Sequence, residues 1–144
     1  GELAITPILY TYWHERDDPP ELVAACMDSL RRSARSVGWR FVRLGGGECG
    51  ARSDEEQGWT LEEPPVPEAT LSPALRSDWY RLSALRATGG VYLDATCIPL
   101  GPPTAWVDMS KDALQGFVCS LDGHSMESWA IACPKGDALL ARWP

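Results

Sequence analysis

The sequence predicts an α/β fold in which helices flank a mixed, mostly parallel sheet. Two observations predict it. Stretches with the apolar spacing of an amphipathic helix alternate along the chain with short runs of β-branched and aromatic residues. The chain has 144 residues, 44% of them hydrophobic, which is enough for one core and too little for two comfortable domains. We therefore expect a single domain over residues 1–144.

The first elements expected are a strand, a helix and a second strand. Residues 5–13 are rich in β-branched and aromatic side chains, which favour a strand. The acidic residues and prolines at 17–20 are typical of a helix start, and apolar residues then recur at helical spacing up to Val37. Gly38 ends that helix, and residues 39–44 alternate apolar and polar side chains as a strand does.

The second half of the chain begins with a long irregular stretch. Residues 45–73 are glycine-rich, then acidic, then proline-rich, and predict a surface loop or lid. Residues 74–88 predict a helix that Gly89 and Gly90 close, and residues 91–93 predict a short buried strand. Three further strands and a final short helix are expected at 97–100, 114–121, 129–133 and 137–143.

Charge and composition exclude some partners. The 13 basic and 20 acidic residues give a net charge of −7, which opposes binding to nucleic acid. No run approaches the about 20 apolar residues that span a bilayer. The five cysteines are an odd number without a Cys-x-x-Cys pair and are expected to be small buried hydrophobes in a reducing compartment. We expect a cytoplasmic protein, free or at a membrane surface, or a Golgi-lumenal one if it belongs to a longer anchored chain.

An acidic side chain interrupts the expected core-facing side of the helix at 74–88. The core-facing stripe is expected to contain Leu75, Trp79, Leu82 and Arg86. Asp78 projects at the edge of this stripe, where a lone carboxylate is costly unless it has a partner such as Arg81. A plain intrahelical ion pair, or a shorter helix capped by Ser77 and Asp78, explains the same spacing.

A second carboxylate stands at the end of the predicted strand at 91–93. Asp94 follows that strand directly, and ligands of open α/β sheets bind outside such carboxyl ends. A carboxylate there can bind a divalent cation or a ribose hydroxyl. The alternative is a turn aspartate that bonds to the backbone of Ala95 and Thr96.

Residues 77–96 resemble the signature of glycosyltransferases with a DXD motif in a sugar-binding region. The likeness is closest to capsular-polysaccharide-synthesis proteins, and more distant to the yeast α-1,6-mannosyltransferase type and the glucosylating clostridial toxins. Residues 6–13 resemble the first strand of that family, and residues 127–132 its later Glu-Asn-Trp strand. The matching features, in order, are Ser77 and Asp78, Arg81, the paired Gly89 and Gly90, and the strand end Tyr92, Leu93 and Asp94.

The resemblance implies a GT-A fold, which is a Rossmann-like sandwich. It implies a hexosyltransferase-like enzyme that moves a sugar from a nucleotide diphosphate donor to a glycan or other hydroxyl acceptor, assisted by Mn²⁺ or Mg²⁺. Asp78 and Arg81 would hold the donor sugar and its phosphates. Asp94 would contact the ribose or, with Thr96, the metal, and Trp13 would lie near the nucleobase. The other donor-binding residues implied are Tyr12, Ser77, Gly90, Tyr92 and Ala95.

Three departures from the family leave a second reading open. Thr96 stands where many relatives have a second aspartate, and Ser128 stands where they often have asparagine. The chain is also shorter than typical members, which suggests a shortened version of the fold. The alternative to the enzyme is a non-catalytic GT-A-like module that binds a nucleotide or a partner, and Thr96 and the short chain are the features that favour it.

Other motifs carry less weight. Residues 45–50 satisfy G-x-G-x-x-G after a predicted strand, but no amphipathic helix follows, so a dinucleotide-dependent oxidoreductase is disfavoured. His14 and His124 are too isolated to be taken as metal ligands. Seven tryptophans could stack on sugars, yet most lie in core-facing patterns that favour packing, including Trp39, Trp79 and Trp129.

Overall fold

The computed structural model describes residues 6–14, 19–45, 51–53 and 61–143. Its sheet has six strands in the order β3-β2-β1-β4-β6-β5. The strands are β1 (Ile8–Tyr12), β2 (Arg40–Leu44), β3 (Ala51–Ser53), β4 (Gly90–Leu93), β5 (Gln115–Val118) and β6 (Met126–Cys133). The α-helices are α1 (Glu21–Ser36), α2 (Pro73–Thr88) and α3 (Ala138–Arg142), and two short 3₁₀ turns are η1 (Glu68–Thr70) and η2 (Pro103–Ala105).

The sheet is mixed, with a parallel centre and antiparallel flanks. β1 pairs in parallel with β2 and with β4, whereas β3, β6 and β5 join by antiparallel pairing. The expectation of a mostly parallel sheet is therefore wrong. Parallel neighbours need a long crossover, which the segments that contain α1 and α2 provide. β5 and β6 are joined by a hairpin at residues 119–125, which makes them antiparallel.

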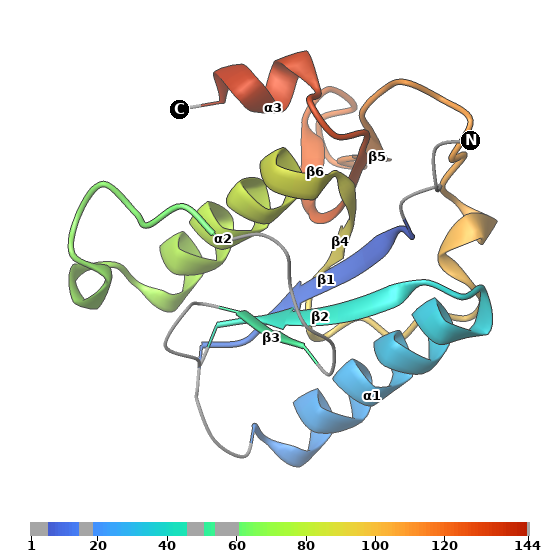
Figure 1. Cartoon of the computed structure of the whole chain (residues 1–144), viewed down its shortest axis with the longest axis horizontal. Helices are drawn as coiled ribbons and strands as arrows, with labels where there is room; N and C mark the ends of the chain where they lie inside the picture. The colour runs from blue at the N-terminus through green and yellow to red at the C-terminus, as the bar shows by residue number, and fades with distance from the viewer. Residues whose placement is uncertain (1–5, 15–18, 46–50, 54–60, 144) are drawn as a thin grey trace.

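Helices cover both faces of this sheet. α1 packs on one face against β1 and β2, and α2 packs on the other against β1 and β4 (Figure 1). β1 supplies side chains to both layers: Tyr10 lies in the core under α2 and Leu9 in the core under α1. All five residues of β1 are buried, as expected for a central strand that is covered on both sides.

The order of the strands reverses at β1. The chain leaves β1 through α1 to reach β2 on one side, and it returns through α2 to β4 on the other side. In open α/β sheets, a ligand crevice forms outside the carboxyl ends of the strands at such a reversal. A ligand site is therefore expected at the carboxyl ends of β1 and β4.

Most predicted elements are confirmed, with two exceptions. The helices at 19–37, 74–88 and 137–143 and the strands at 5–13, 39–44, 91–93, 114–121 and 129–133 correspond to observed elements. The strand expected at 97–100 is absent, because Pro99 cannot donate to a ladder and Ile98 and Leu100 are exposed there. The long stretch at 45–73 contains β3 and η1, which its composition did not predict.

The buried face of α2 differs from the predicted apolar stripe. Leu75 is 55% exposed and the side chain of Asp78 is 56% exposed, so neither borders the core. On the face of α2 opposite Leu75, polar side chains are buried because they form hydrogen bonds with one another and with the sheet. A prediction that follows only apolar residues does not detect such a face. The residues of α2 that are buried are Ser77, Tyr80, Arg81, Ser83, Ala84 and Leu85.

The paired glycines between α2 and β4 allow two close backbone approaches. Gly89 and Gly90 both have positive φ, 66° and 114°. A Cβ on Gly89 would lie 2.4 Å from the amide nitrogen of Lys135, and one on Gly90 would lie 2.5 Å from the carbonyl oxygen of Ile8. Any other residue here would be strained and would clash with backbone, so these glycines fix how α2 enters β4.

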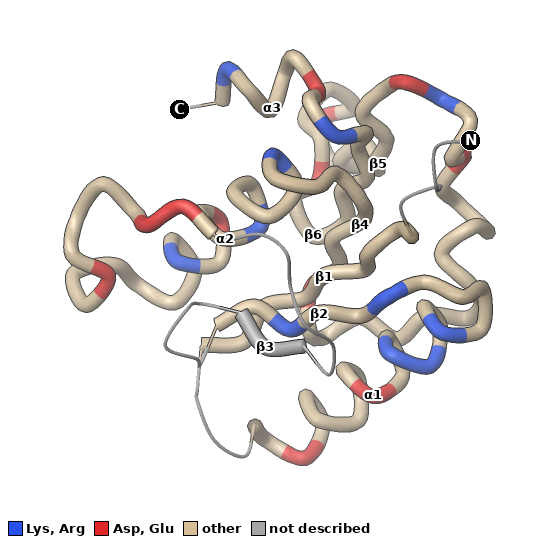
Figure 2. Tube along the Cα trace, in the orientation of Figure 1, with Lys and Arg blue, Asp and Glu red and all other residues tan. Residues whose placement is uncertain are grey.

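Charged side chains are unevenly distributed over the molecule. Basic residues gather along α1 and β2, and acidic residues lie on the loop that precedes α2 (Figure 2). Among the helices of the described ranges, none combines the length and the apolar character that a bilayer span requires.

Candidate functional site

A closed cluster of polar side chains lies between α2 and the carboxyl end of β4. Its members are Ser77 and Arg81 on α2, Tyr92 on β4 and Asp94 just after β4, here called the Asp94 cluster. The Tyr92 hydroxyl donates to Asp94 Oδ1 at 2.9 Å, and Arg81 Nη2 lies 3.3 Å from the same oxygen. Arg81 Nη2 also donates to Ser77 Oγ at 2.7 Å, and Ser77 Oγ lies 3.2 Å from the Tyr92 hydroxyl. Because the Tyr92 proton goes to Asp94, Ser77 donates to Tyr92.

Local geometry explains why these four side chains meet. Ser77 and Arg81 are four residues apart on a helix, so they share one face. Tyr92 and Asp94 are two residues apart along an extended strand, so they project to the same side of the sheet. Packing α2 on that side brings the two pairs together, and the connection from α2 through Gly89 and Gly90 to β4 sets their register.

Arg81 carries a buried positive charge with many partners. It is only 6% exposed and its guanidinium lies over the Tyr92 ring, 4.3 Å from the centroid. Its Nε donates to the Ser77 carbonyl at 3.3 Å, and its Nη1 donates to the carbonyl of Ser128 on β6. The compensating charges are Asp94 and, 3.6 Å from Nη2, Asp78. The ion pair between Asp78 and Arg81 within α2 is therefore present. This pair was the alternative explanation of the spacing, in place of donor binding.

Tyr92 is held in its protonated, donating form. Burial raises its pKa above the usual 10.0, the Asp94 carboxylate raises it further, and Arg81 opposes both. Since the phenol is protonated throughout the physiological pH range, its hydrogen bond to Asp94 is permanent. Tyr92 thus orients one carboxylate oxygen rather than exchanging protons with a ligand.

Asp94 is the member of the cluster that faces outward. Its side chain is 36% exposed, and both hydrogen bonds from the described residues go to Oδ1, so Oδ2 accepts none from that part of the chain. The side chain does not bond to the backbone of Ala95 or Thr96, which excludes the turn-aspartate alternative. The main chain of Asp94 is fixed instead, by its amide to the carbonyl of Trp129 at 2.9 Å and by its carbonyl to the amide of Cys97 at 3.0 Å.

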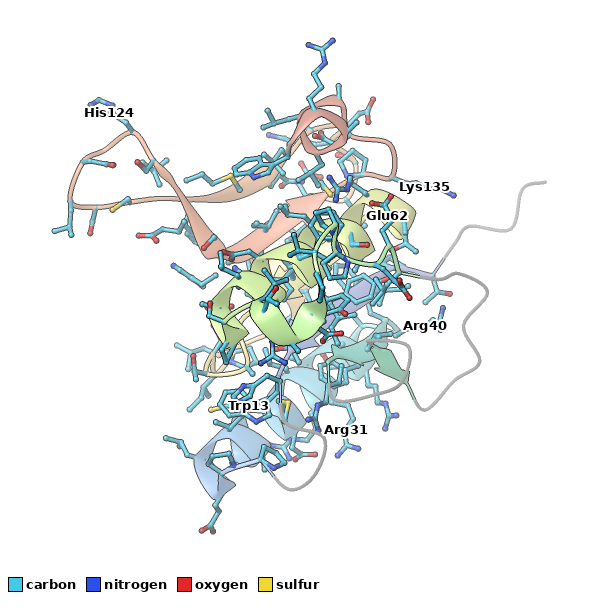
Figure 3. All side chains as sticks on the ribbon, turned by 90° about the vertical axis from the view of Figure 1, so that its left-hand side faces the viewer. Trp13, Arg31, Arg40, Glu62, His124 and Lys135 are labelled. Atoms are coloured by element: carbon cyan, nitrogen blue, oxygen red, sulfur yellow. The ribbon has the colours of Figure 1, made fainter. Side chains whose placement is uncertain are left out.

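Trp13 and Ala95 meet at the point where the strand order reverses. Trp13 follows β1, Ala95 follows β4, and both pack against α1 through Val23 and Met27 (Figure 3). The Trp13 indole N–H is buried, and no acceptor among the described residues lies within hydrogen-bond reach of it. A buried donor without a partner is unusual, so this indole has hydrogen-bonding capacity to spare at the reversal point.

The remaining predicted donor-binding residues do not join Asp94. Tyr12 points to the α2 face, is 6% exposed and stacks on Tyr80 with ring centroids 5.9 Å apart. Gly90 lies at the opposite end of β4, where it pairs with Cys133. Thr96, which was predicted as a metal ligand, differs from these two residues, because it follows Asp94 by two positions in an exposed turn and so remains a neighbour of Asp94.

The described residues hold no ready-made metal cage. No group of three or more His, Cys, Asp or Glu side chains suited to a cation occurs in the described ranges. Asp94 and Asp78 nevertheless lie within 3.6 Å of the same Arg81 nitrogen. One or two carboxylates plus substrate phosphates is the set by which proteins usually hold Mg²⁺. The two carboxylates are therefore oxygen donors of the kind that a divalent cation can use.

Of the minor motifs, His124 lies outside this site, and the glycine-rich motif contributes one described residue, Gly45, beside Trp13. His124 is at the tip of the β5–β6 hairpin, far from Trp13 (Figure 3). Gly45 has a φ of 84°, and a Cβ there would lie 2.4 Å from the Trp13 carbonyl oxygen. The other residues of the glycine-rich turn, 46–50, lie outside the described residues.

Sequence reasoning missed an apolar pocket on the α1 side of β4. It has a volume of about 340 Å³, and Leu93, Trp106, Phe117 and Trp129 lie in its wall. Trp129 is 37% exposed, so the interpretation of this tryptophan as a core residue is wrong, whereas Trp39 is buried as expected. The signal was present in the sequence, since Ile98 and Leu100 are large apolar residues next to three prolines, which do not form a buried strand.

Comparisons of the chain with protein families, with curated proteins and with solved structures found no match.

Proposed function

We propose that this protein binds a nucleotide diphosphate-sugar at the carboxyl ends of β1 and β4 and transfers the sugar to a hydroxyl acceptor. The sheet would then be a GT-A variant of the Rossmann-like fold. In the reaction, the bond between the anomeric carbon and the diphosphate oxygen breaks and a bond to the acceptor oxygen forms. The hydroxyl proton neutralises one charge of the departing diphosphate.

The observation that carries the proposal is the convergence of Asp94, Arg81 and Asp78 outside the carboxyl end of β4. Two carboxylates within 3.6 Å of one guanidinium nitrogen, at the reversal of strand order, form a polar surface where ligands of open α/β sheets bind. Carboxylates accept hydrogen bonds from sugar and ribose hydroxyls. Arg81 supplies the positive charge that a diphosphate requires as charge develops on it.

A divalent cation completes this assignment. Asp94, with the Thr96 hydroxyl and the nearby Asp78 carboxylate, would hold Mn²⁺ or Mg²⁺ together with the donor phosphates. When bound, the cation supplies neutralisation of the charge that develops on the leaving diphosphate. The protein's own part is to fix Oδ1 of Asp94 through Tyr92 and Arg81, so that Oδ2 is presented in one orientation. Trp13, with its spare indole N–H, supports the assignment of the nucleobase to the end of β1.

The second candidate is a non-catalytic module that binds a nucleotide or a partner. The observation that favours it is the saturation of Arg81, whose three nitrogens already contact Ser77, Ser128 and Asp94. A guanidinium with so many internal partners can serve to lock α2 to β4 and β6 without touching a ligand. The two candidates differ in turnover, which can be measured.

The test is calorimetric titration with UDP- and GDP-sugars, with and without Mn²⁺, and with a CMP-sugar, which carries only one phosphate, as the comparison. We expect one of these donors to bind, and Asp94→Asn to weaken its binding about ten- to hundredfold, because a charge-assisted contact is lost. Asp112→Asn is the matched control, since Asp112 is an exposed aspartate in the loop before β5. Its binding should equal that of the unaltered protein.

The outcomes separate the candidates. Release of the nucleoside diphosphate, abolished in Asp94→Asn and retained in Asp112→Asn, eliminates the non-catalytic module. Binding without turnover for every acceptor offered favours the module. No binding of any donor in either condition overturns the transferase and the nucleotide-binding form of the module.

A further inference from the structure

The apolar pocket on the α1 side of β4 has the size of a small-molecule site. Its volume of about 340 Å³ lies at the lower end of the range for such sites. Three aromatic rings stand in a row along it. The Trp106 and Phe117 centroids are 5.2 Å apart, and the Phe117 and Trp129 rings are stacked with centroids 5.0 Å apart and an interplanar angle of 12°. The loop at 98–103 forms the opposite wall.

The walls of the pocket select an uncharged ligand. None of its lining residues is acidic or basic. Its one hydroxyl, that of Ser33, already donates to the Gly101 carbonyl at 2.8 Å and so ties the loop to α1. Burial of a charged or strongly polar group here would be uncompensated, whereas burial of methylene or methyl groups would be favourable.

The apolar walls also remain open to solvent. Trp129 is 37% exposed, Phe117 39%, Ile98 62% and Leu100 102%. Contiguous exposed apolar surface of this kind marks a binding site more often than a chance arrangement. A recessed pocket of this volume admits a chain or a ring more readily than the flat face of a folded protein.

The pocket and the Asp94 cluster are joined at the end of β4. Leu93 lines the pocket, and the next residue is Asp94. Trp129 contributes its ring to the pocket and its carbonyl to the Asp94 amide at 2.9 Å. Ser128, one residue earlier, accepts from Arg81. An apolar site therefore begins one residue from a polar one, on the opposite face of the sheet.

We propose that this pocket binds the uncharged aliphatic chain of an amphipathic molecule whose polar head lies at the carboxyl end of β4. The argument for chain binding stands on the pocket alone. The further assignment of this amphiphile as the sugar acceptor rests on the proposed function, with its hydroxyl-bearing head toward Asp94.

The test compares octyl β-D-glucoside, below its micelle-forming concentration, with methyl β-D-glucoside. The two share a sugar and differ in the chain. We expect the octyl compound alone to bind by calorimetry and to shift the indole N–H signals of Trp106 and Trp129 in NMR spectra. Ile98→Asn should weaken binding about tenfold, because it places an amide in the apolar wall. Leu22→Asn, an equally exposed leucine on α1 outside the pocket, should leave binding unchanged.

Each other result overturns the proposal. Equal binding of both glucosides means that the aromatic rings recognise the sugar and not the chain. Equal loss in Ile98→Asn and Leu22→Asn means that the chain binds elsewhere. Self-association of the free protein that Ile98→Asn abolishes means that a second copy covers the pocket. Octyl glucoside binding is measured without any nucleotide-sugar, and Ile98→Asn should keep donor binding, so failure of one proposal is distinguishable from failure of the other.

Discussion

The two sides of the carboxyl end of β4 differ in polarity and in exposure to solvent. On the α2 side, Ser77, Arg81 and Tyr92 are buried polar groups that satisfy one another and leave Asp94 outermost. On the α1 side, the wall of the pocket is apolar and exposed, and the described residues leave it open. One side is polar and internally satisfied, and the other is apolar and in contact with water.

This difference predicts that the Asp94 cluster contributes to stability and the pocket mainly to binding. A buried polar network is costly unless every member is satisfied, so the Asp94 cluster is expected to contribute to both stability and orientation. Exposed apolar side chains contribute little to folding, and the ligand proposed for the pocket would explain their exposure. Substitutions in the cluster should therefore affect the free energy of unfolding, and substitutions such as Ile98→Asn should mainly affect binding.

The largest expected effect is that of Arg81→Met. Methionine retains much of the arginine stem but removes the side-chain donor to the Ser128 carbonyl and one of the two donors to Asp94 Oδ1, together with the positive charge that faces Asp94. We expect the free energy of unfolding in urea to fall by about 2 to 4 kcal/mol. Arg142→Met, in an exposed position on α3, is the matched control and should change it by less than about 0.5 kcal/mol. Similar small changes in both variants would contradict the structural role of the cluster.

A smaller effect is expected for Tyr92→Phe, which removes one hydroxyl and keeps the ring under Arg81. The loss should be about 1 to 2 kcal/mol, because Ser77 loses its acceptor and Asp94 a donor. A double-mutant cycle with Asp94→Asn should give a coupling energy of about 1 kcal/mol. The control cycle pairs Asp94→Asn with Tyr10→Phe, whose hydroxyl bonds to Thr88 instead. Additivity in both cycles would show that Tyr92 does not orient Asp94.

The contrast between the two sides also explains what the sequence could predict. The strand at 91–93 and its terminal Asp94 were visible because a short apolar run ended in a carboxylate. The helix at 74–88 was predicted with the right ends, but its buried face was predicted only in part. Leu82 packs partly buried against the core as expected, whereas Leu75 is exposed and Arg81 is among the buried residues. Apolar periodicity identifies a buried face only when burial is apolar.

The pocket was not predictable by the same means, because its wall comes from separate parts of the chain. Trp106 lies after η2, Phe117 on β5 and Trp129 on β6, and their order along the sheet depends on antiparallel pairing that a mostly parallel sheet would not give. The apolar residues at 97–100 were read as a strand, although Pro99 argued against it. The apolar side of β4 is therefore assembled by pairing between strands that are distant in the sequence, and the local sequence pattern does not predict that pairing.

The smallest effect concerns the hairpin that carries two of the three aromatic rings. Asp122, in the turn between β5 and β6, accepts hydrogen bonds from the amides of His124 and Ser125 and from the Ser125 hydroxyl. These bonds, that of the hydroxyl foremost, lower the pKa of Asp122 from 3.8 to about 2. Because the folded form has the lower pKa, the ionised carboxylate stabilises the turn above about pH 3.8, and this contribution is lost as the pH falls through about 2.

An NMR titration of the Asp122 carboxyl carbon should therefore show a midpoint near 2, and the Trp129 indole signal should move with it if the turn positions the pocket wall. In Ser125→Ala the midpoint should rise toward 3.8, because the hydroxyl donor is lost, and donor binding at Asp94 at neutral pH should be unchanged. A midpoint that stays low in this variant would contradict the assignment of the turn. A Trp129 signal that ignores the titration would mean that β4 and η2, rather than the hairpin turn, hold the apolar side in place.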